Sequence, residues 1–243
     1  MTAEREFWTE AWGEFGPRIT GLQAWPSLDE HWKRIPVAPL GYTPSPKGLV
    51  ALNLAIFTLN GCLMPLQQSP TALSNLWQAG YMSLITLSVR FALEVAGGVA
   101  YARWVWRQLE LTGDVAKAME RAGRLLWGAR SSVELPWGGS ATMTSINVMN
   151  FIDKMAASGY KEARLDYEFL CESCHPSFLQ HVFWNMVSVP SSDFKNPLFE
   201  ARMRAQLEQT VSSLEKACTF ASTQAEDLLV EVLPSVDADR SRL

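Results

Sequence analysis

Apolar residues from Lys47 onward recur every three to four positions, as on a helix, and the β-branched residues are too scattered to form strands. The pattern predicts an all-α fold. Helices are expected over residues 47–64, 70–110, 113–129, 141–156, 159–174 and 197–232, with Gly97 and Gly98 as a candidate break in the second and a loop over 134–139. Ser69-Pro70 and Asn196-Pro197 each place a capping side chain just before a proline, which favours helix starts at both points.

The first 46 residues have a different pattern, because tryptophan and proline are dense in them. They contain Trp8, Trp12, Trp25 and Trp32, and Pro17, Pro26, Pro36, Pro39, Pro44 and Pro46. Such dense proline prevents long regular structure, and indole rings require apolar cover. Residues 1–46 are therefore expected to form an arm packed on the body, with a short helix near residues 4–15; docking of a protein partner is an alternative role. A helical bundle is expected over 47–236, followed by a frayed tail, 237–243.

Composition adds two expectations. Hydrophobic residues make up 48% of the 243 residues and charged residues 19%, so much of the helical surface must be covered by other helices or by a second subunit. One main domain that forms a homodimer fits this excess. The net charge of −4 gives no overall basic field, so RNA binding would require a local basic patch, and none stands out in the sequence.

The amino terminus, residues 1–8, lacks the basic start, apolar run and cleavage site of a secretory signal, so a cytoplasmic location is expected. Thiols are reduced there, and free cysteines are expected at positions 62, 171, 174 and 218. The two most apolar stretches run over 49–66 and 80–106. Arg90 and Glu94 lie in the middle of the second, which is costly in lipid, so no membrane span is predicted.

A polar sector runs along the expected helix 70–110. At about 100° per residue, one narrow side of this helix carries Ser83, Thr86, Arg90, Glu94, Gly97, Tyr101 and Gln108. Two interpretations remain open. The sector is either a solvated side, on which Arg90 and Glu94 form a weak i,i+4 ion pair, or a face buried against a partner helix, where that pair requires further hydrogen bonds.

The segment Tyr167–Ser177 holds two cysteines, a histidine, a tyrosine and a glutamate within eleven residues. In a helix over 159–174, His175 would stand at the C-terminal end, where the helix dipole and Glu172 favour its cationic form. The plain interpretation of the segment is a helix cap with core residues around it.

The same segment allows a metal or haem interpretation. Cys171, Cys174 and His175 match the pattern of c-type haem attachment, and with His181 they supply four zinc ligands. Haem attachment normally needs an exported chain, the ligand spacing is unusual for zinc, and a C-x-x-C redox pair would be expected beside a βαβ unit. We therefore expect no metal and no other cofactor.

Two segments together carry a family resemblance. The first is Arg90-Phe-Ala-Leu-Glu94 with Tyr101 on the same helix, and the second is Tyr167-x-x-Leu-Cys-Glu172-x-x-His175-Pro-Ser177. Over about residues 75–185 the chain resembles an uncharacterised family of bacterial HEPN-like helical proteins with an R-x-x-x-E helix and a Y-x-x-L-(S/C)-E-x-x-H-P-(S/N) motif. The resemblance implies an up-and-down helical bundle, commonly dimeric, with a polar cluster formed by Arg90, Glu94, Tyr101, Tyr167, Glu172 and His175.

HEPN relatives that cut RNA carry an arginine, four to six residues and then a histidine; the histidine assists attack by a ribose 2′-hydroxyl and the arginine steadies the phosphate. No arginine precedes His31, His175 or His181 in this way. The resemblance therefore favours a binding or regulatory module of bacterial stress or defence systems over an enzyme. The alternative is a metal-independent ribonuclease of toxin or defence type, in which Arg90 replaces the missing arginine beside His175.

Overall fold

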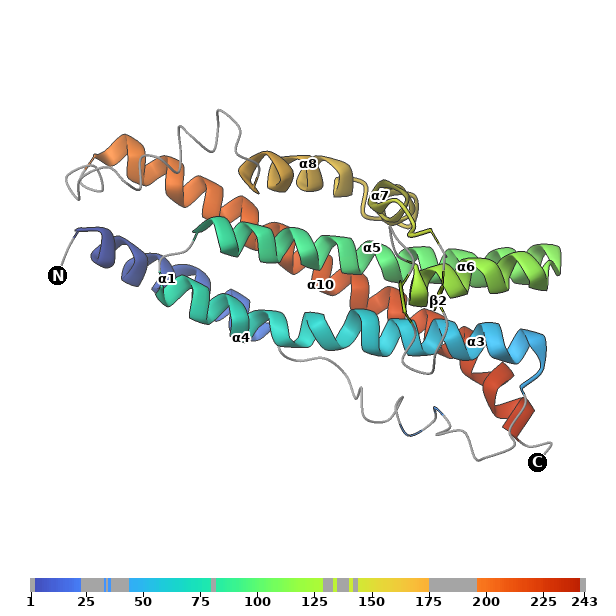
Figure 1. Ribbon diagram of the computed structural model, residues 1–243. Helices are drawn as coiled ribbons and strands as arrows, with labels where there is room; N and C mark the ends of the chain where they lie inside the picture. The colour runs from blue at the N-terminus through green and yellow to red at the C-terminus, as the bar shows by residue number, and fades with distance from the viewer. Residues whose placement is uncertain are drawn as a thin grey trace.

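The computed structural model describes residues 3–22, 33, 35, 44–79, 82–128, 133–134, 140–141, 144–174 and 196–240. Within these ranges the chain forms an all-α bundle, as the apolar spacing predicts, and its long helices run back and forth along a common direction (Figure 1). The helices are α1 (Ala3–Gly21), α3 (Pro46–Ile56), α4 (Met64–Gln78), α5 (Met82–Thr112), α6 (Val115–Trp127), α7 (Val148–Ala157), α8 (Ala163–Cys174) and α10 (Pro197–Arg240). The strands β1 (Val133–Glu134) and β2 (Ser140–Ala141) pair antiparallel between α6 and α7.

Helix α5 lies at the centre of the bundle, in contact with α3, α4, α6, α7, α8 and α10. It continues without interruption through Gly97 and Gly98, so the candidate break is wrong. Its buried side chains include Leu93 and Val99 together with small residues such as Ala92 and Ala96, which allow neighbouring helices to approach closely. The central position of α5 brings its polar sector against other helices.

The predicted helix start at Ser69-Pro70 is wrong. A π-helical segment, η1 (Phe57–Leu63), joins α3 to α4, and Pro70 lies inside α4. The Ser69 hydroxyl donates to the Pro65 carbonyl at 3.0 Å, a local bond that replaces the capping role expected of this serine. The helical run instead stops at Ala79, three residues before α5 begins, and buried Leu73 and Trp77 hold the residues after the proline in helical form.

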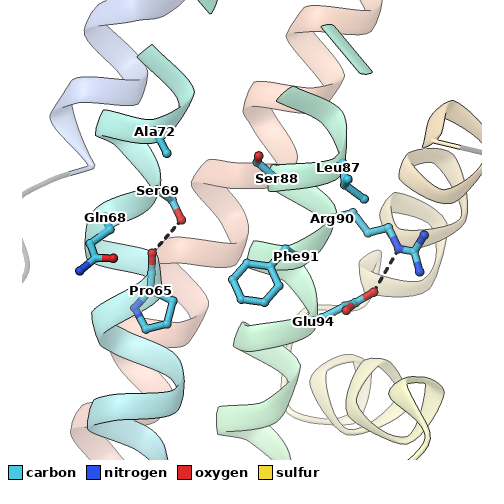
Figure 2. Close-up of a pocket in the computed structure, with 9 residues that line it drawn as sticks. All are labelled: Pro65, Gln68, Ser69, Ala72, Leu87, Ser88, Arg90, Phe91 and Glu94. Atoms are coloured by element: carbon cyan, nitrogen blue, oxygen red, sulfur yellow. Dashed lines mark hydrogen bonds and ion pairs between the residues drawn. The ribbon is translucent and has the colours of Figure 1, made fainter. Parts of the chain in front are cut away.

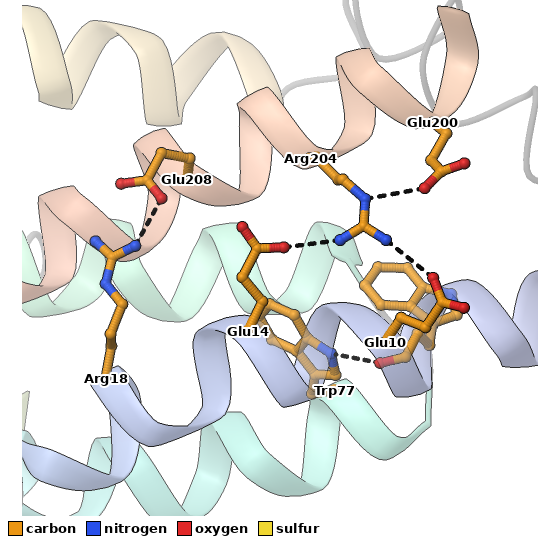
Figure 3. Close-up of polar contacts among 8 residues, drawn as sticks. Glu10, Glu14, Arg18, Trp77, Glu200, Arg204 and Glu208 are labelled. Atoms are coloured by element: carbon orange, nitrogen blue, oxygen red, sulfur yellow. Dashed lines mark hydrogen bonds and ion pairs between the residues drawn. The ribbon is translucent and has the colours of Figure 1, made fainter. Parts of the chain in front are cut away.

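Helix α1 is longer than the predicted short helix and continues through Pro17 to Gly21. It lies against α4 and α10 (Figures 1 and 3). Arg18 forms ion pairs with Glu208 and Glu215 of α10, each at 2.6 Å. In the opposite direction, Arg204 of α10 forms ion pairs with Glu10 and Glu14 of α1 (Figure 3). The buried indole of Trp77 donates to the Trp8 carbonyl at 3.2 Å.

Two further predicted boundaries differ from the structure. The helix expected over 141–156 begins only at Val148, where the Asn147 side chain caps it. Helix α10 continues to Arg240 instead of ending near residue 232, so residues 237–240 are not a frayed tail. Asp239 is buried in this last turn, and its contacts hold the helix end in place.

Two helical stretches, Pro46–Gln78 and Leu84–Thr112, are long and apolar enough to cross a membrane when only length and composition are considered. The most apolar windows of these stretches are 50% and 67% buried inside the bundle. Core helices of bundles commonly meet the same criteria, so the two stretches are weak evidence for membrane spans.

Candidate functional site

A groove of about 570 Å³ lies between α4 and α5 (Figure 2). It is lined by Pro65, Gln68, Ser69 and Ala72 of α4 and by Leu87, Ser88, Arg90, Phe91 and Glu94 of α5. Leu84, Leu87 and Phe91 follow one another at helical spacing and are 43%, 47% and 49% exposed. An apolar face of α5 is therefore open beside the groove, which is typical of a docking surface.

A polar cluster lies at the rim of this groove, where α5 meets α8. Arg90 Nε donates a hydrogen bond to Glu94 Oε1 at 3.0 Å, and Arg90 Nη2 donates to the Tyr167 hydroxyl at 3.2 Å. The Tyr167 hydroxyl donates in turn to Glu94 Oε1 at 3.0 Å. Figure 2 shows Arg90 and Glu94 pointing away from α4 while Phe91 points between the two helices. The Arg90, Glu94 and Tyr167 side chains thus close a triangle of hydrogen bonds.

The triangle is shielded from solvent on most sides. The Arg90 and Glu94 side chains are only 23% and 29% exposed. The Arg90 guanidinium lies over the Tyr167 ring, 5.3 Å from its centroid, in a cation–π contact. Burial raises the pKa of the Tyr167 phenol, and the charge of Glu94 adds to the rise. The phenol therefore stays protonated and keeps its role as a donor.

Cys171 lies one turn after Tyr167 on α8 as a half-buried free thiol. Burial raises the pKa of this thiol, although the positive charge of Arg90 opposes the rise. The group is therefore a thiol at neutral pH. A catalytic cysteine requires the opposite, a pKa lowered until the thiolate dominates.

The polar sector of α5 is buried against other helices over much of its length. Thr86 is fully buried, and Gly97 lies directly against α7. A Cβ placed on Gly97 would come within 2.9 Å of the Phe151 backbone carbon, so only glycine allows this approach without a shift. Of the two interpretations left open by the sequence, contact with partner helices is the correct one for this part of the sector.

Arg90, Glu94 and Tyr167 are the members of the predicted set that meet in the triangle. Tyr101 lies further along α5, where its ring packs on Trp104 and Phe151 with centroids 5.2 and 5.5 Å apart. Glu172 is exposed, because α8 turns residues 167 and 171 toward α5 and residue 172 outward. His175 lies outside the described residues.

Of the four residues considered as zinc ligands, only Cys171 has a described side chain. Within the described ranges, no three His, Cys, Asp or Glu side chains gather in a way that could hold a metal ion. Cys62 and Cys218 are buried free thiols, in agreement with the expectation of unpaired cysteines at those positions.

The groove itself was not predicted from the sequence. The available signal was the spacing of Leu84, Leu87 and Phe91 on one side of α5. A helix that is apolar on nearly every side is normally covered on every side, so the pattern gave no reason to expect that this side is open.

Comparison with protein-family models, with curated proteins and with solved structures found no match to this chain. The function must therefore be argued from the groove and the polar cluster themselves.

Proposed function

We propose that the protein is a HEPN-like helical module that binds through the groove between α4 and α5 and does not act as an enzyme. The observation that supports this proposal is the closed triangle of Arg90, Glu94 and Tyr167, in which each side chain is bonded to the other two. A catalytic site needs a base or nucleophile free to meet a substrate. A closed triangle beside an open apolar face fits a rim that orients a docked partner.

The ribonuclease alternative requires Arg90 to contact a phosphate. In the structure its guanidinium already donates to Glu94 and Tyr167, and a phosphate at its remaining N–H groups would be repelled by the Glu94 carboxylate, 3.0 Å from Nε. The nearby Cys171 is a protonated thiol and offers no replacement nucleophile. This arrangement favours binding over RNA cleavage.

The occupant of the groove is inferred to be a second copy of the chain. Arg90 and Glu94 neutralise each other, so the rim carries no net charge and favours an apolar, uncharged partner. The α5 face beside the groove has this character, with large exposed residues Leu87 and Phe91. The opposite wall supplies small side chains such as Ala72 that can receive them. A surface with both projections and recesses is what a two-fold symmetric interface requires.

Sedimentation equilibrium tests this proposal with two matched variants on one helix. The wild type is expected to be a dimer at micromolar concentration, and Leu87→Asp is expected to be a folded monomer. Leu111→Asp changes a leucine that is 78% exposed at the other end of α5, away from the groove lining, and should remain a dimer. A monomeric wild type, or a Leu87→Asp variant that still dimerises, would overturn the proposal. Circular dichroism establishes that each variant is folded.

RNA cleavage is tested separately. Purified protein is expected to leave single-stranded RNA intact, with or without added metal. RNA cleavage that is lost in both Arg90→Ala and His175→Ala would reject the binding module in favour of the ribonuclease.

A further inference from the structure

A second cluster of polar and charged side chains surrounds Trp104, away from the groove. The Lys154 ammonium of α7 lies 3.9 Å from the Trp104 ring centroid, and the Arg121 guanidinium of α6 lies 4.4 Å from it. Three helices, α5, α6 and α7, therefore bring two cations onto one half-buried indole. Cation–π contacts hold both cations in place while leaving their charges unneutralised.

Positive charge exceeds negative charge in this cluster, where Glu120 is a carboxylate that acts on Tyr101 beside Arg121 and Arg124. Among the residues that the structure describes, neither Arg121 nor Lys154 forms an ion pair with a carboxylate. Arg124, one turn after Arg121, donates to the Thr144 carbonyl at 2.9 Å and meets a single carboxylate, that of exposed Glu120, at 3.8 Å. The Trp104 ring thus positions Arg121 and Lys154, while a backbone carbonyl and one exposed carboxylate position Arg124.

Tyr101 completes the cluster. Its buried ring packs on Trp104, with centroids 5.2 Å apart, and its hydroxyl forms no hydrogen bond within the described part of the chain. Burial raises the pKa of this phenol, the positive charges of Arg121 and Arg124 act to lower it, and the negative charge of Glu120 adds to the rise. A phenol and two cations are therefore all held against the indole of Trp104.

We propose that this cluster, formed by Tyr101, Arg121 and Lys154 beside Trp104, is a binding site for a phosphate-class oxyanion. A guanidinium presents a planar pair of donors, an ammonium a compact charge and a phenol a neutral donor, and together they can contact different oxygens of one phosphate group. The two positive charges of Arg121 and Lys154 match the charge of a phosphate ligand better than that of a carboxylate ligand. The shared chemistry is the phosphate, whether it comes from a free anion or from the backbone of single-stranded RNA.

This inference goes beyond the proposed function, because the two sites use different residues. Tyr101 is seven positions after Glu94, about 10 Å further along the α5 axis. The basic patch that the sequence did not reveal is assembled only in the fold, since Arg121 and Lys154 belong to helices separated by the β1–β2 pair.

Isothermal titration calorimetry at low ionic strength tests the site with inorganic phosphate and with a short single-stranded RNA, each titrated into the full-length protein. We expect the wild type to bind at least one of the two. Arg121→Gln and Lys154→Gln should each weaken that binding by about tenfold or more, as expected for the loss of a charge-assisted contact. Arg202→Gln removes an exposed cation from α10, remote from Trp104, and should leave binding unchanged.

The outcomes separate the sources of phosphate and the two proposals. Binding of inorganic phosphate that is lost in the variants identifies a free anion as the ligand, whereas binding of RNA alone identifies the nucleic-acid backbone. A wild type that binds neither, or variants that bind as tightly as the wild type, would overturn the inference. Both glutamine variants should keep the oligomeric state of the wild type. Oligomeric state therefore tests the groove proposal alone, and phosphate binding tests the Trp104 cluster alone.

Discussion

The carboxylate of Asp239 accepts hydrogen bonds from both the backbone N–H and the hydroxyl of Ser45, at 2.8 and 2.7 Å. The Ser45 hydroxyl also accepts from the Gly48 N–H at 3.0 Å and so caps the first turn of α3. A Cβ at position 48 would overlap the Asp239 carboxylate. The last turn of α10 is therefore fastened to the first turn of α3 by a buried acid, a cap and a glycine.

Asp239→Ala should lower the free energy of unfolding by about 1–3 kcal/mol, because it leaves two donors of Ser45 without their shared acceptor. Chemical denaturation of the full-length chain measures the effect. Glu226→Ala removes an exposed carboxylate from the same helix and should change stability by less than about 0.5 kcal/mol. Equal effects of the two substitutions would show that the Ser45 contact does not stabilise the fold.

Arg90→Ala should destabilise the protein by about 1–2 kcal/mol. This value lies below the 3–5 kcal/mol of a fully buried pair, because the Arg90 and Glu94 side chains retain 23% and 29% of their exposure and solvent screens them in part. The exposed pair of Arg164 and Asp153 is the matched control, and Arg164→Ala should cost less than about 1 kcal/mol.

The triangle also predicts which residues are coupled. In a double-mutant cycle, Arg90→Ala and Tyr167→Phe should show a coupling energy of about 0.5–1 kcal/mol, because each loses the hydrogen bond that joins them. Glu172 is exposed, so Glu172→Gln should add independently to Arg90→Ala, contrary to an arrangement in which all six predicted residues converge. Denaturant titrations of the single and double variants provide both values.

Gly97→Ala should destabilise the protein by about 1–3 kcal/mol, since the added methyl meets the Phe151 backbone and forces α5 and α7 apart. Gly13→Ala is the control on another helix, where an added Cβ would have nothing within 4 Å. There the same substitution should stabilise the helix by about 0.5–1 kcal/mol. Thermal unfolding should therefore shift in opposite directions for the two variants.

Alkaline pH should weaken the fold through Cys218. Burial raises the pKa of this thiol from 9.0 to about 12. Because the folded pKa lies above the unfolded one, the contribution of the thiol to stability is complete below pH 9 and is lost as the pH rises toward 12. When the pH rises from 8 to 10.5, the free energy of unfolding should therefore fall in both proteins. The fall in Cys218→Ala should be smaller than that in the wild type by about 2 kcal/mol. Cys171 is only half-buried, so Cys171→Ala should reduce this pH-dependent fall in unfolding free energy by a smaller amount than Cys218→Ala does.

The helical fold follows from the sequence because its apolar residues recur at helical spacing over long stretches. Helix boundaries follow less well, because they depend on contacts far along the chain. Pro70 is a local signal for a helix start, yet packing of Leu73 and Trp77 keeps it inside α4. The end of α10 at Arg240 is likewise set by a distant contact, that of Asp239 with Ser45, and not by a local sequence signal.

The candidate site was predictable only in part. Arg90, Glu94 and Tyr167 could be grouped because their donors and acceptors complement one another when buried. The groove and the cations around Trp104 depend on which helices become neighbours in space, and residue types at separate positions do not specify this. Arg121 and Lys154 each look like an ordinary solvated cation in the sequence.

Helix α10 follows every other described helix in the chain, and it contacts α1, α3 and α5 along its 44 residues. The nascent chain therefore cannot close its core while the ribosome is still making this helix. Until α10 is released, the apolar sides of the earlier helices remain open to chaperones and to other nascent chains. Productive folding of this bundle consequently requires α10 to have been made, and truncation within α10 should yield aggregated rather than partly folded protein.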